Sequence, residues 1–135
     1  MKSPFMSSGP LAQDLGLLTL RILSGSVLLT HGYPKLQKIL QGNLQFGDPI
    51  GIGQVPSLYL ATFAEFFCAI LVIIGLYTRL SLIPLMINMA TAFFIVHSAD
   101  DFGIKELSLL FLGMFAVLFL TGPGRFSVDK QIYKA

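Results

Sequence analysis

Residues 57–97 read SLYLATFAEFFCAILVIIGLYTRLSLIPLMINMATAFFIVH, and this stretch decides the fold. It contains two apolar runs joined by Gly75-Leu76-Tyr77-Thr78-Arg79, whose glycine and polar residues are typical of a tight turn. A helix of about 20 apolar residues spans the roughly 30 Å of hydrocarbon in a bilayer. The stretch therefore predicts two antiparallel transmembrane helices, over residues 57–76 and 80–97.

Two further apolar runs flank this pair, at residues 11–33 and 105–121. The last run ends at Gly122-Pro123-Gly124, which cannot continue a helix. Four spans of this length use most of the chain and leave no room for a separate soluble domain. The sequence thus predicts one all-α membrane domain over residues 1–135, built as a bundle of four transmembrane helices.

The segments between and beyond the spans carry helix-breaking residues. Pro34 disfavours a helical conformation at the residue before it, so the first helix is predicted to end near Tyr33. Several glycines and two prolines follow, which makes residues 36–56 the longest predicted loop. Residues 1–10 are predicted to be unstructured, and the polar tail 125–135 is predicted to return to water.

The composition requires lipid around the chain. With 54% of 135 residues hydrophobic, 12% charged and a mean hydropathy of +0.76, there is too little polar surface to enclose a soluble core. The lipid bilayer is therefore the predicted partner. A single cysteine, Cys68, excludes an internal disulfide and any all-cysteine metal site. The nine basic residues are scattered, so no nucleic-acid partner is predicted.

The basic residues differ in number between the two ends of the predicted bundle. Five lie on the side of both termini and three lie on the opposite side. Because lysine and arginine are enriched on the cytoplasmic side of membrane proteins, both termini are predicted to be cytoplasmic. The five are Lys2, Arg79, Arg125, Lys130 and Lys134, and the three are Lys35, Lys38 and Lys105.

Small and polar residues share one face of each of the first two predicted helices. At about 100° per residue, the face of the first helix comprises Arg21, Ser24, Gly25, Leu28, Gly32 and Lys35. The face of the second comprises Ala61, Thr62, Glu65, Cys68 and Ala69. Small residues allow membrane helices to approach closely, so both faces are predicted to point into the bundle.

Three polar residues form a predicted intramembrane site. A lone arginine near the centre of a membrane helix costs roughly 2.5–3.5 kcal/mol on insertion scales, so Arg21 requires partners. Depth along the helices places Arg21, Glu65 and Asn88 within reach of one another, which predicts an Arg21–Glu65 pair joined by Asn88. Such a group either fixes helix packing or handles a proton or a ligand.

A second polar group lies at the outer ends of the predicted helices and comprises His31, Lys35, His97 and Glu106. Imidazoles there can bind a quinone headgroup, whereas long charged side chains at helix ends commonly reach to water. The histidines and carboxylates lack the tight spacing of a metal site, so no metal is predicted. His97 lies opposite Asn88 on an ideal helix, so a regular third helix would keep the two in separate sites.

The ordered series of these features resembles the DoxX family of small four-helix membrane proteins. The series runs through Arg21, His31-Gly32-Tyr33-Pro34-Lys35-Leu36, Glu65 and Gly75-Leu76-Tyr77-Thr78-Arg79, and ends with His97, Glu106 and Gly122-Pro123-Gly124-Arg125-Phe126-Ser127. The resemblance covers residues 17–129. It implies a bacterial inner-membrane protein tied to oxidoreductase systems, with relatives described as quinol-oxidase or thiosulfate–quinone oxidoreductase subunits and as partners in oxidative-stress complexes.

Three functions are open at this point. The first is a membrane subunit of an oxidoreductase assembly, in which the intramembrane and outer groups line a quinone site or a proton path. The second is a small carrier or channel for a polar solute that uses the Arg21–Glu65 pair. The third is an anchor that recruits soluble enzymes through residues 36–56. Quinone is the one cofactor suggested, and oxidoreductase subunits are the expected protein partners.

Overall fold

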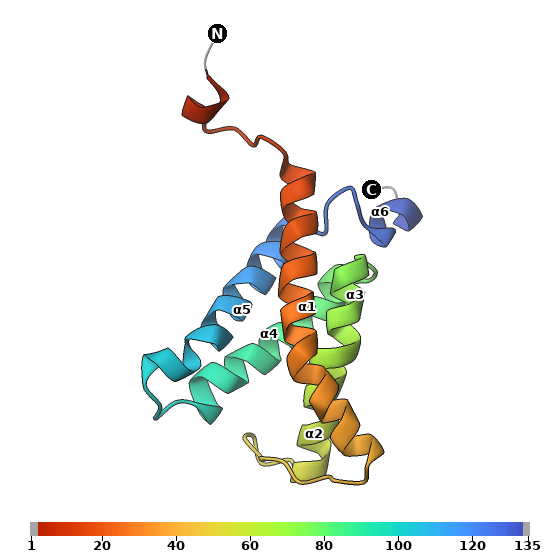
Figure 1. Cartoon of the computed structure of the whole chain (residues 1–135), viewed down its shortest axis with the longest axis vertical. Helices are drawn as coiled ribbons and strands as arrows, with labels where there is room; N and C mark the ends of the chain where they lie inside the picture. Colours follow the sequence, from red (N-terminus) through yellow and green to blue (C-terminus); the bar gives the residue numbers. More distant parts are fainter. Residues whose placement is uncertain (1–2, 134–135) are drawn as a thin grey trace.

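The computed structural model describes residues 3–133, and Figure 1 shows that they form a bundle of helices. Four helical segments are long and apolar enough to cross a membrane, which confirms the predicted fold class. The first is α1 (Gln13–Leu40) and the fourth is α5 (Phe102–Thr121). The second joins α2 (Gln54–Thr62), the π-helix η2 (Phe63–Cys68) and α3 (Ala69–Ile74). The third joins α4 (Thr78–Thr91) and the π-helix η3 (Ala92–Val96).

The predicted spans are observed with shifts at their ends. The second and fourth spans begin three residues earlier than predicted, at Gln54 and Phe102, and the third covers Thr78–Val96. Both ends of the described chain lie toward the same end of the bundle (Figure 1). Lys2 and Lys134, which enter the charge count above, lie outside the described residues.

The first span is longer than predicted because Pro34 does not end it, and α1 continues to Leu40. A proline removes one backbone donor and crowds the preceding turn, but membrane helices tolerate it where neighbouring groups satisfy the freed carbonyls. The carbonyl that Pro34 leaves without its helical donor is that of Thr30. In the same turn, Lys35 Nζ donates to the His31 carbonyl oxygen at 3.3 Å. Figure 1 shows that α1 changes direction in its C-terminal part, as expected for a proline bend. The predicted loop 36–56 is therefore shortened to residues 41–53.

The chain ends carry more structure than predicted. A 3-10 turn, η1 (Pro4–Met6), precedes α1, and a short helix, α6 (Val128–Tyr133), follows α5. The Asp129 carboxylate accepts hydrogen bonds from the amides of Tyr77 at 2.7 Å and Thr78 at 2.8 Å. The tail predicted to return to water thus forms a helix with no buried residue, and its carboxylate satisfies amides at the start of α4.

Burial confirms the small-residue faces of the first two spans. A Cβ atom on Gly25 would lie 2.5 Å from Cγ1 of Ile73, and one on Gly32 would lie 2.3 Å from the Glu65 carbonyl oxygen. The two spans therefore pack backbone against backbone, as membrane helices with small interfacial residues do. The buried set comprises Arg21, Ser24, Gly25, Leu28 and Gly32 of α1 and Ala61, Thr62, Glu65, Cys68 and Ala69 of the second span.

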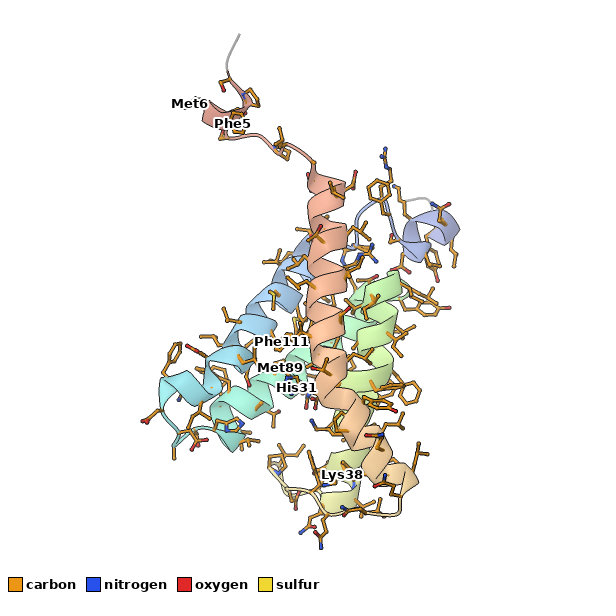
Figure 2. The ribbon with its side chains drawn as sticks, viewed as in Figure 1. Phe5, Met6, His31, Lys38, Met89 and Phe111 are labelled. Carbon is orange, nitrogen blue, oxygen red and sulfur yellow. The ribbon has the colours of Figure 1, made fainter. Side chains whose placement is uncertain are left out.

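The helices α4 and α5 pack side by side as a second pair (Figure 1). Their contact is made by large side chains, of which Met89 and Phe111 are labelled in Figure 2. The outward faces are also apolar, and Leu120 for example is 79% exposed. An apolar outer surface on every span suits lipid. The buried side chains of this pair are Leu82, Leu85, Met89, Phe111, Phe115 and Leu118.

Candidate functional site

A cavity of about 800 Å³ lies among the spans, toward the end of the bundle that carries the loop 41–53. α4 and α5 diverge toward that end from α1 and α2 (Figure 1). The lining comes from α1, α2, η2, α4, η3 and α5 and from the loop 41–53. Most of the lining is aliphatic or aromatic. Three of the lining residues, His31, Met89 and Phe111, lie at a similar height in the bundle (Figure 2). The polar side chains in the lining include His31, Lys35, Glu65, Asn88, Thr91 and His97.

Lys35 and Asn88 are both hydrogen-bonded to Glu65, and these three residues are called the polar cluster below. Lys35 Nζ lies 2.9 Å from Glu65 Oε1, and Asn88 Nδ2 donates to Glu65 Oε2 at 3.1 Å. The side chain of Glu65 is only 8% exposed, and that of Lys35 is 22% exposed. One carboxylate in the bundle interior thus has a partner on each oxygen.

The pairing offsets the cost of a charge inside the bundle. A buried ion that loses its partner destabilises a protein by roughly 3–5 kcal/mol, whereas a paired and hydrogen-bonded ion is tolerated. The cluster still has hydrogen-bonding capacity, because an ammonium group has three protons and an amide has two donors and an acceptor. Lys35 uses protons on Glu65 and on the His31 carbonyl, and Asn88 uses one on Glu65. The rest are free to bind a ligand in the cavity.

Two π-helices position the polar side chains of this cavity. Glu65 lies inside η2, and η3 separates Asn88 from His97. A π-turn inserts one extra residue into a helix and re-aims the side chains that follow, and such turns are frequent at functional sites. Asn88 and His97 were expected in separate sites only if the third helix were regular, and η3 removes that condition. Both residues line the cavity. Gly32 lets α1 pack directly on the backbone of η2 at Glu65.

The outer residues predicted from sequence occupy different places. His31 and His97 line the cavity together with Lys35, whereas Glu106 is exposed at the start of α5 and lies outside the lining. His97 Nδ1 lies 2.8 Å from Asp100 Oδ2, so its second ring nitrogen is left for a ligand. The structure thus joins three of the four outer residues to Glu65 and Asn88 in one site.

Arg21 does not pair with Glu65, so that prediction is wrong. Arg21 is fully buried, and its guanidinium donates to the carbonyl oxygens of Val72 at 3.3 Å, Ile73 at 3.0 Å and Phe126. Val72 lies seven residues beyond Glu65 on the second span, which is about 10 Å along the helix axis. Arg21 therefore belongs to the end of the bundle opposite the cavity.

The way in which α3 ends explains why Arg21 binds backbone carbonyls. Gly75 is left-handed at φ +74° and stops the helix, which leaves its last carbonyls without helical donors. Those carbonyls also form the negative end of the helix dipole, which attracts a cation. The arginine satisfies them and at the same time ties the segment after α5 to the bundle through Phe126.

Lys35 is the partner of Glu65 that sequence reasoning missed. It lies on the same predicted face as Arg21, but a helix ending at Tyr33 would have left it outside the span. A helix that continues through Pro34 carries the lysine past the second span instead, and this brings its ammonium to Glu65. The position of Lys35 on the small-residue face of the first helix therefore indicated that it points into the bundle. The prediction failed because Pro34 was expected to end the helix.

Residues 3–133 contain no group of three His, Cys, Asp or Glu side chains that could hold a metal ion. Cys68 is buried in the core beside Leu28 and Val72, where it acts as a small apolar side chain. The chemistry that the cavity offers is accordingly hydrogen bonding and proton handling by the polar cluster and the two histidines, within an apolar enclosure.

Residues 16–98 match the DoxX family. The inner membrane protein YqjF of Escherichia coli is 30% identical over 127 residues, which cover 90% of this chain and 95% of that protein. A Bacillus subtilis protein named "Putative oxidoreductase CatD" is 29% identical over 122 residues, with 90% of each chain covered. An uncharacterised Haemophilus influenzae protein is 30% identical over 129 residues, covering 87% of this chain and 91% of the relative. No solved structure matches this chain.

Proposed function

The chain belongs to the DoxX family of membrane proteins, and from this premise we propose that it is the membrane component of an oxidoreductase system and binds a quinone in its cavity. One observation carries the proposal: a charged, hydrogen-bonded cluster of Lys35, Glu65 and Asn88 lines a mostly apolar cavity. The name of the relative CatD supports the redox part. The bacterial inner membrane is the proposed location, in keeping with the relative YqjF.

The residues present fit a quinone headgroup. Such a group is a flat ring with two carbonyl acceptors and an apolar tail, and small-molecule sites have volumes of about 300–1,000 Å³ with few polar groups. The cavity volume of about 800 Å³ lies in this range. Asn88 and Lys35 retain N–H donors for one carbonyl, and His31 or His97 can donate to the other. The aliphatic lining accommodates the tail.

The same residues can hold protons beside such a ligand. A bound quinone would accept two electrons and two protons when it is reduced to a quinol. Lys35 Nζ, the Glu65 carboxylate and the ring nitrogens of the two histidines are the proton-holding atoms in the lining. The electrons come, in this proposal, from a partner subunit of the oxidoreductase system.

The proposal is tested by quinone binding to the protein in phosphatidylcholine nanodiscs, with radiolabelled decylubiquinone and menadione as probes. Asn88→Leu keeps the side-chain size and removes the amide. We expect it to weaken binding about five-fold or more, because one hydrogen bond to the ligand is lost and the remaining cluster is perturbed. Asn43→Leu is the matched control, since Asn43 is exposed in the loop and lies outside the cavity lining.

Two results would overturn the proposal. The first is wild-type binding no greater than that of empty nanodiscs. The second is an equal effect of the two asparagine substitutions. A flux of polar solutes in proteoliposomes, without quinone binding, would instead identify the carrier that the sequence left open. A redox enzyme that copurifies with the protein from native membranes would identify its partner subunit.

A further inference from the structure

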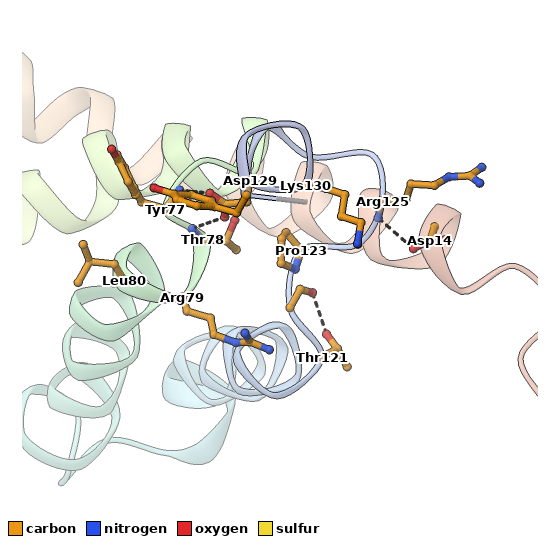
Figure 3. Close-up of a pocket in the computed structure, with 13 residues that line it drawn as sticks. Asp14, Tyr77, Thr78, Arg79, Leu80, Thr121, Pro123, Arg125, Asp129 and Lys130 are labelled. Carbon is orange, nitrogen blue, oxygen red and sulfur yellow. Dashed lines mark hydrogen bonds between the residues drawn. The ribbon is translucent and has the colours of Figure 1, made fainter. Parts of the chain in front are cut away.

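A second cavity, of about 630 Å³, lies at the end of the bundle that carries both chain ends (Figure 3). It is bordered by the start of α1, the start of α4, the Gly122-Pro123-Gly124 segment after α5, and α6. The polar cluster lies at the other end of the spans and contributes nothing to this lining. The two cavities are therefore separate sites.

The start of α4 faces this cavity with unused hydrogen-bond donors. Thr78 is fully buried, and its hydroxyl has no hydrogen-bond partner within residues 3–133. The first amides of a helix have no acceptor inside the helix, and Asp129 takes only those of Tyr77 and Thr78. The next two amides, of Arg79 and Leu80, belong to residues that line the cavity. A buried hydroxyl without a partner indicates that an acceptor from outside the chain completes the site.

Arg79 adds a positive charge at the same place. Its Nε donates to the Phe119 carbonyl oxygen at 2.9 Å, which fixes the guanidinium against the end of α5 (Figure 3). Its two terminal nitrogens form no hydrogen bond within the described part of the chain. A fixed guanidinium beside a helix N-terminus is a standard arrangement for binding a phosphate group.

The other charges of the lining leave the cavity net positive. Arg125 and Lys130 also line it, against two carboxylates. Both carboxylates are engaged with backbone donors, because Asp129 accepts from two amides and Asp14 Oδ1 accepts from the Arg125 amide at 2.9 Å. Figure 3 shows the Arg125 side chain pointing away from the other labelled residues, so Arg79 and Lys130 are the cations nearest the interior.

The cavity and its hydrogen-bond donors lie at the membrane surface. It lies where four membrane spans begin or end, which is the level of the lipid headgroups. Tyr77 and Tyr133 line it, and tyrosine is enriched at this level in membrane proteins. A hydrogen bond with Tyr77 raises the pKa of Tyr133 above its usual value. Basic pockets between membrane helices bind anionic headgroups.

We propose that this cavity binds the phosphate group of an anionic phospholipid, with the Thr78 hydroxyl and the Arg79 guanidinium as its main contacts. The test titrates the purified full chain in a neutral detergent with dioctanoyl phosphatidylglycerol, dioctanoyl phosphatidylcholine or inorganic phosphate. The thermal unfolding midpoint is followed, because a ligand that binds only the folded state raises it. Phosphatidylglycerol is expected to raise the midpoint at about ten-fold lower concentration than phosphatidylcholine.

Thr78→Val is the decisive variant, because the valine has the same shape and the hydroxyl has no internal hydrogen bond to lose. We expect its midpoint without lipid to be unchanged or higher, and its apparent affinity for phosphatidylglycerol to fall about ten-fold. Arg79→Gln should remove the preference for phosphatidylglycerol. Lys38→Gln removes one positive charge at the opposite end of the bundle (Figure 2), outside this lining, and should behave as the wild type.

Three outcomes would overturn the proposal. The two lipids could act at equal concentrations, or Thr78→Val could bind phosphatidylglycerol as tightly as the wild type. Inorganic phosphate could also raise the midpoint as effectively as phosphatidylglycerol, which would assign the site to a soluble phosphate compound instead of a lipid. A loss of affinity for phosphatidylglycerol of about ten-fold in Thr78→Val, without loss of stability, supports the proposal.

Discussion

Replacing Gly32 with alanine is expected to destabilise the protein by about 3 kcal/mol or more, although it adds a single methyl group. The new Cβ would lie 2.3 Å from the carbonyl oxygen and 2.4 Å from the carbonyl carbon of Glu65, and 2.8 Å from the Phe66 amide nitrogen. All three are backbone atoms of η2, which have no rotamer by which to move aside. α1 must therefore shift away from the second span, and the shift also separates Lys35 from Glu65.

The matched control for this change lies in the same helix. Gly16 has no atom within 4 Å of the position its Cβ would take. Gly16→Ala should therefore be neutral or stabilise by roughly 0.5–1 kcal/mol, because alanine has the higher helix propensity. The measurement is the unfolding midpoint of both variants in one detergent. Equal midpoints for Gly32→Ala and Gly16→Ala would contradict the close packing of α1 on η2.

Replacing Arg21 with methionine is expected to cost about 3–5 kcal/mol of stability. The change removes every hydrogen bond from the guanidinium to the carbonyls of Val72, Ile73 and Phe126. The carbonyls of Val72 and Ile73 lie at the end of α3, where Val72 also accepts from the Gly75 amide at 3.2 Å. A buried acceptor that loses its partner costs about 1–3 kcal/mol. The bond to Phe126 also holds the segment before α6, so this segment should become sensitive to protease in the variant.

Arg125→Met is the control for Arg21→Met. Arg125 is exposed, and its guanidinium lies over the Phe126 ring with 4.9 Å to the centroid. Loss of such a surface contact should change stability by no more than about 0.5 kcal/mol. Thermal unfolding and limited proteolysis of the C-terminal segment distinguish the two arginines. An Arg21→Met protein that unfolds with the wild type and keeps its tail protected would refute the anchoring role of Arg21.

Much of the fold could be predicted because membrane spans follow from length and hydropathy alone. The faces that pack together could also be predicted, since Gly25 and Gly32 recur at helical spacing with other small residues. Glu65 and Asn88 were expected to meet, and the structure places Asn88 Nδ2 3.1 Å from Glu65 Oε2. These features depend on regular helices, for which 3.6 residues per turn is a safe assumption.

The features that sequence reasoning missed all arise from irregular helix geometry. Pro34 indicated a helix end, but the helix bends and continues, which brings Lys35 and not Arg21 to Glu65. The π-helices η2 and η3 have no sequence signature, so the turn that brings His97 to the same cavity as Asn88 could not be foreseen. Arg21 donates to carbonyl oxygens at the end of α3, where Gly75 stops the helix. Such backbone acceptors could not be predicted by pairing charged side chains.

The structure separates Arg21 from Glu65 and Asn88, with which it was predicted to form one layer. It joins those two residues to Lys35 of the predicted outer group. Arg21 and Lys35 are fourteen residues apart on α1, which corresponds to about 21 Å along a straight helix. The layer at Arg21 stabilises the end of the bundle that carries both chain ends. The layer at Lys35 borders the larger cavity, so a ligand is to be sought there.

The quinone content of the protein purified with its native lipids tests the central claim most directly. The chain is extracted from bacterial membranes, washed in detergent, and analysed by mass spectrometry for quinone relative to phospholipid. The account predicts that quinone is enriched over the bulk membrane in the wild type and in Asn43→Leu, and that the enrichment is lost in Asn88→Leu. Quinone at the bulk-membrane ratio in all three proteins would contradict it.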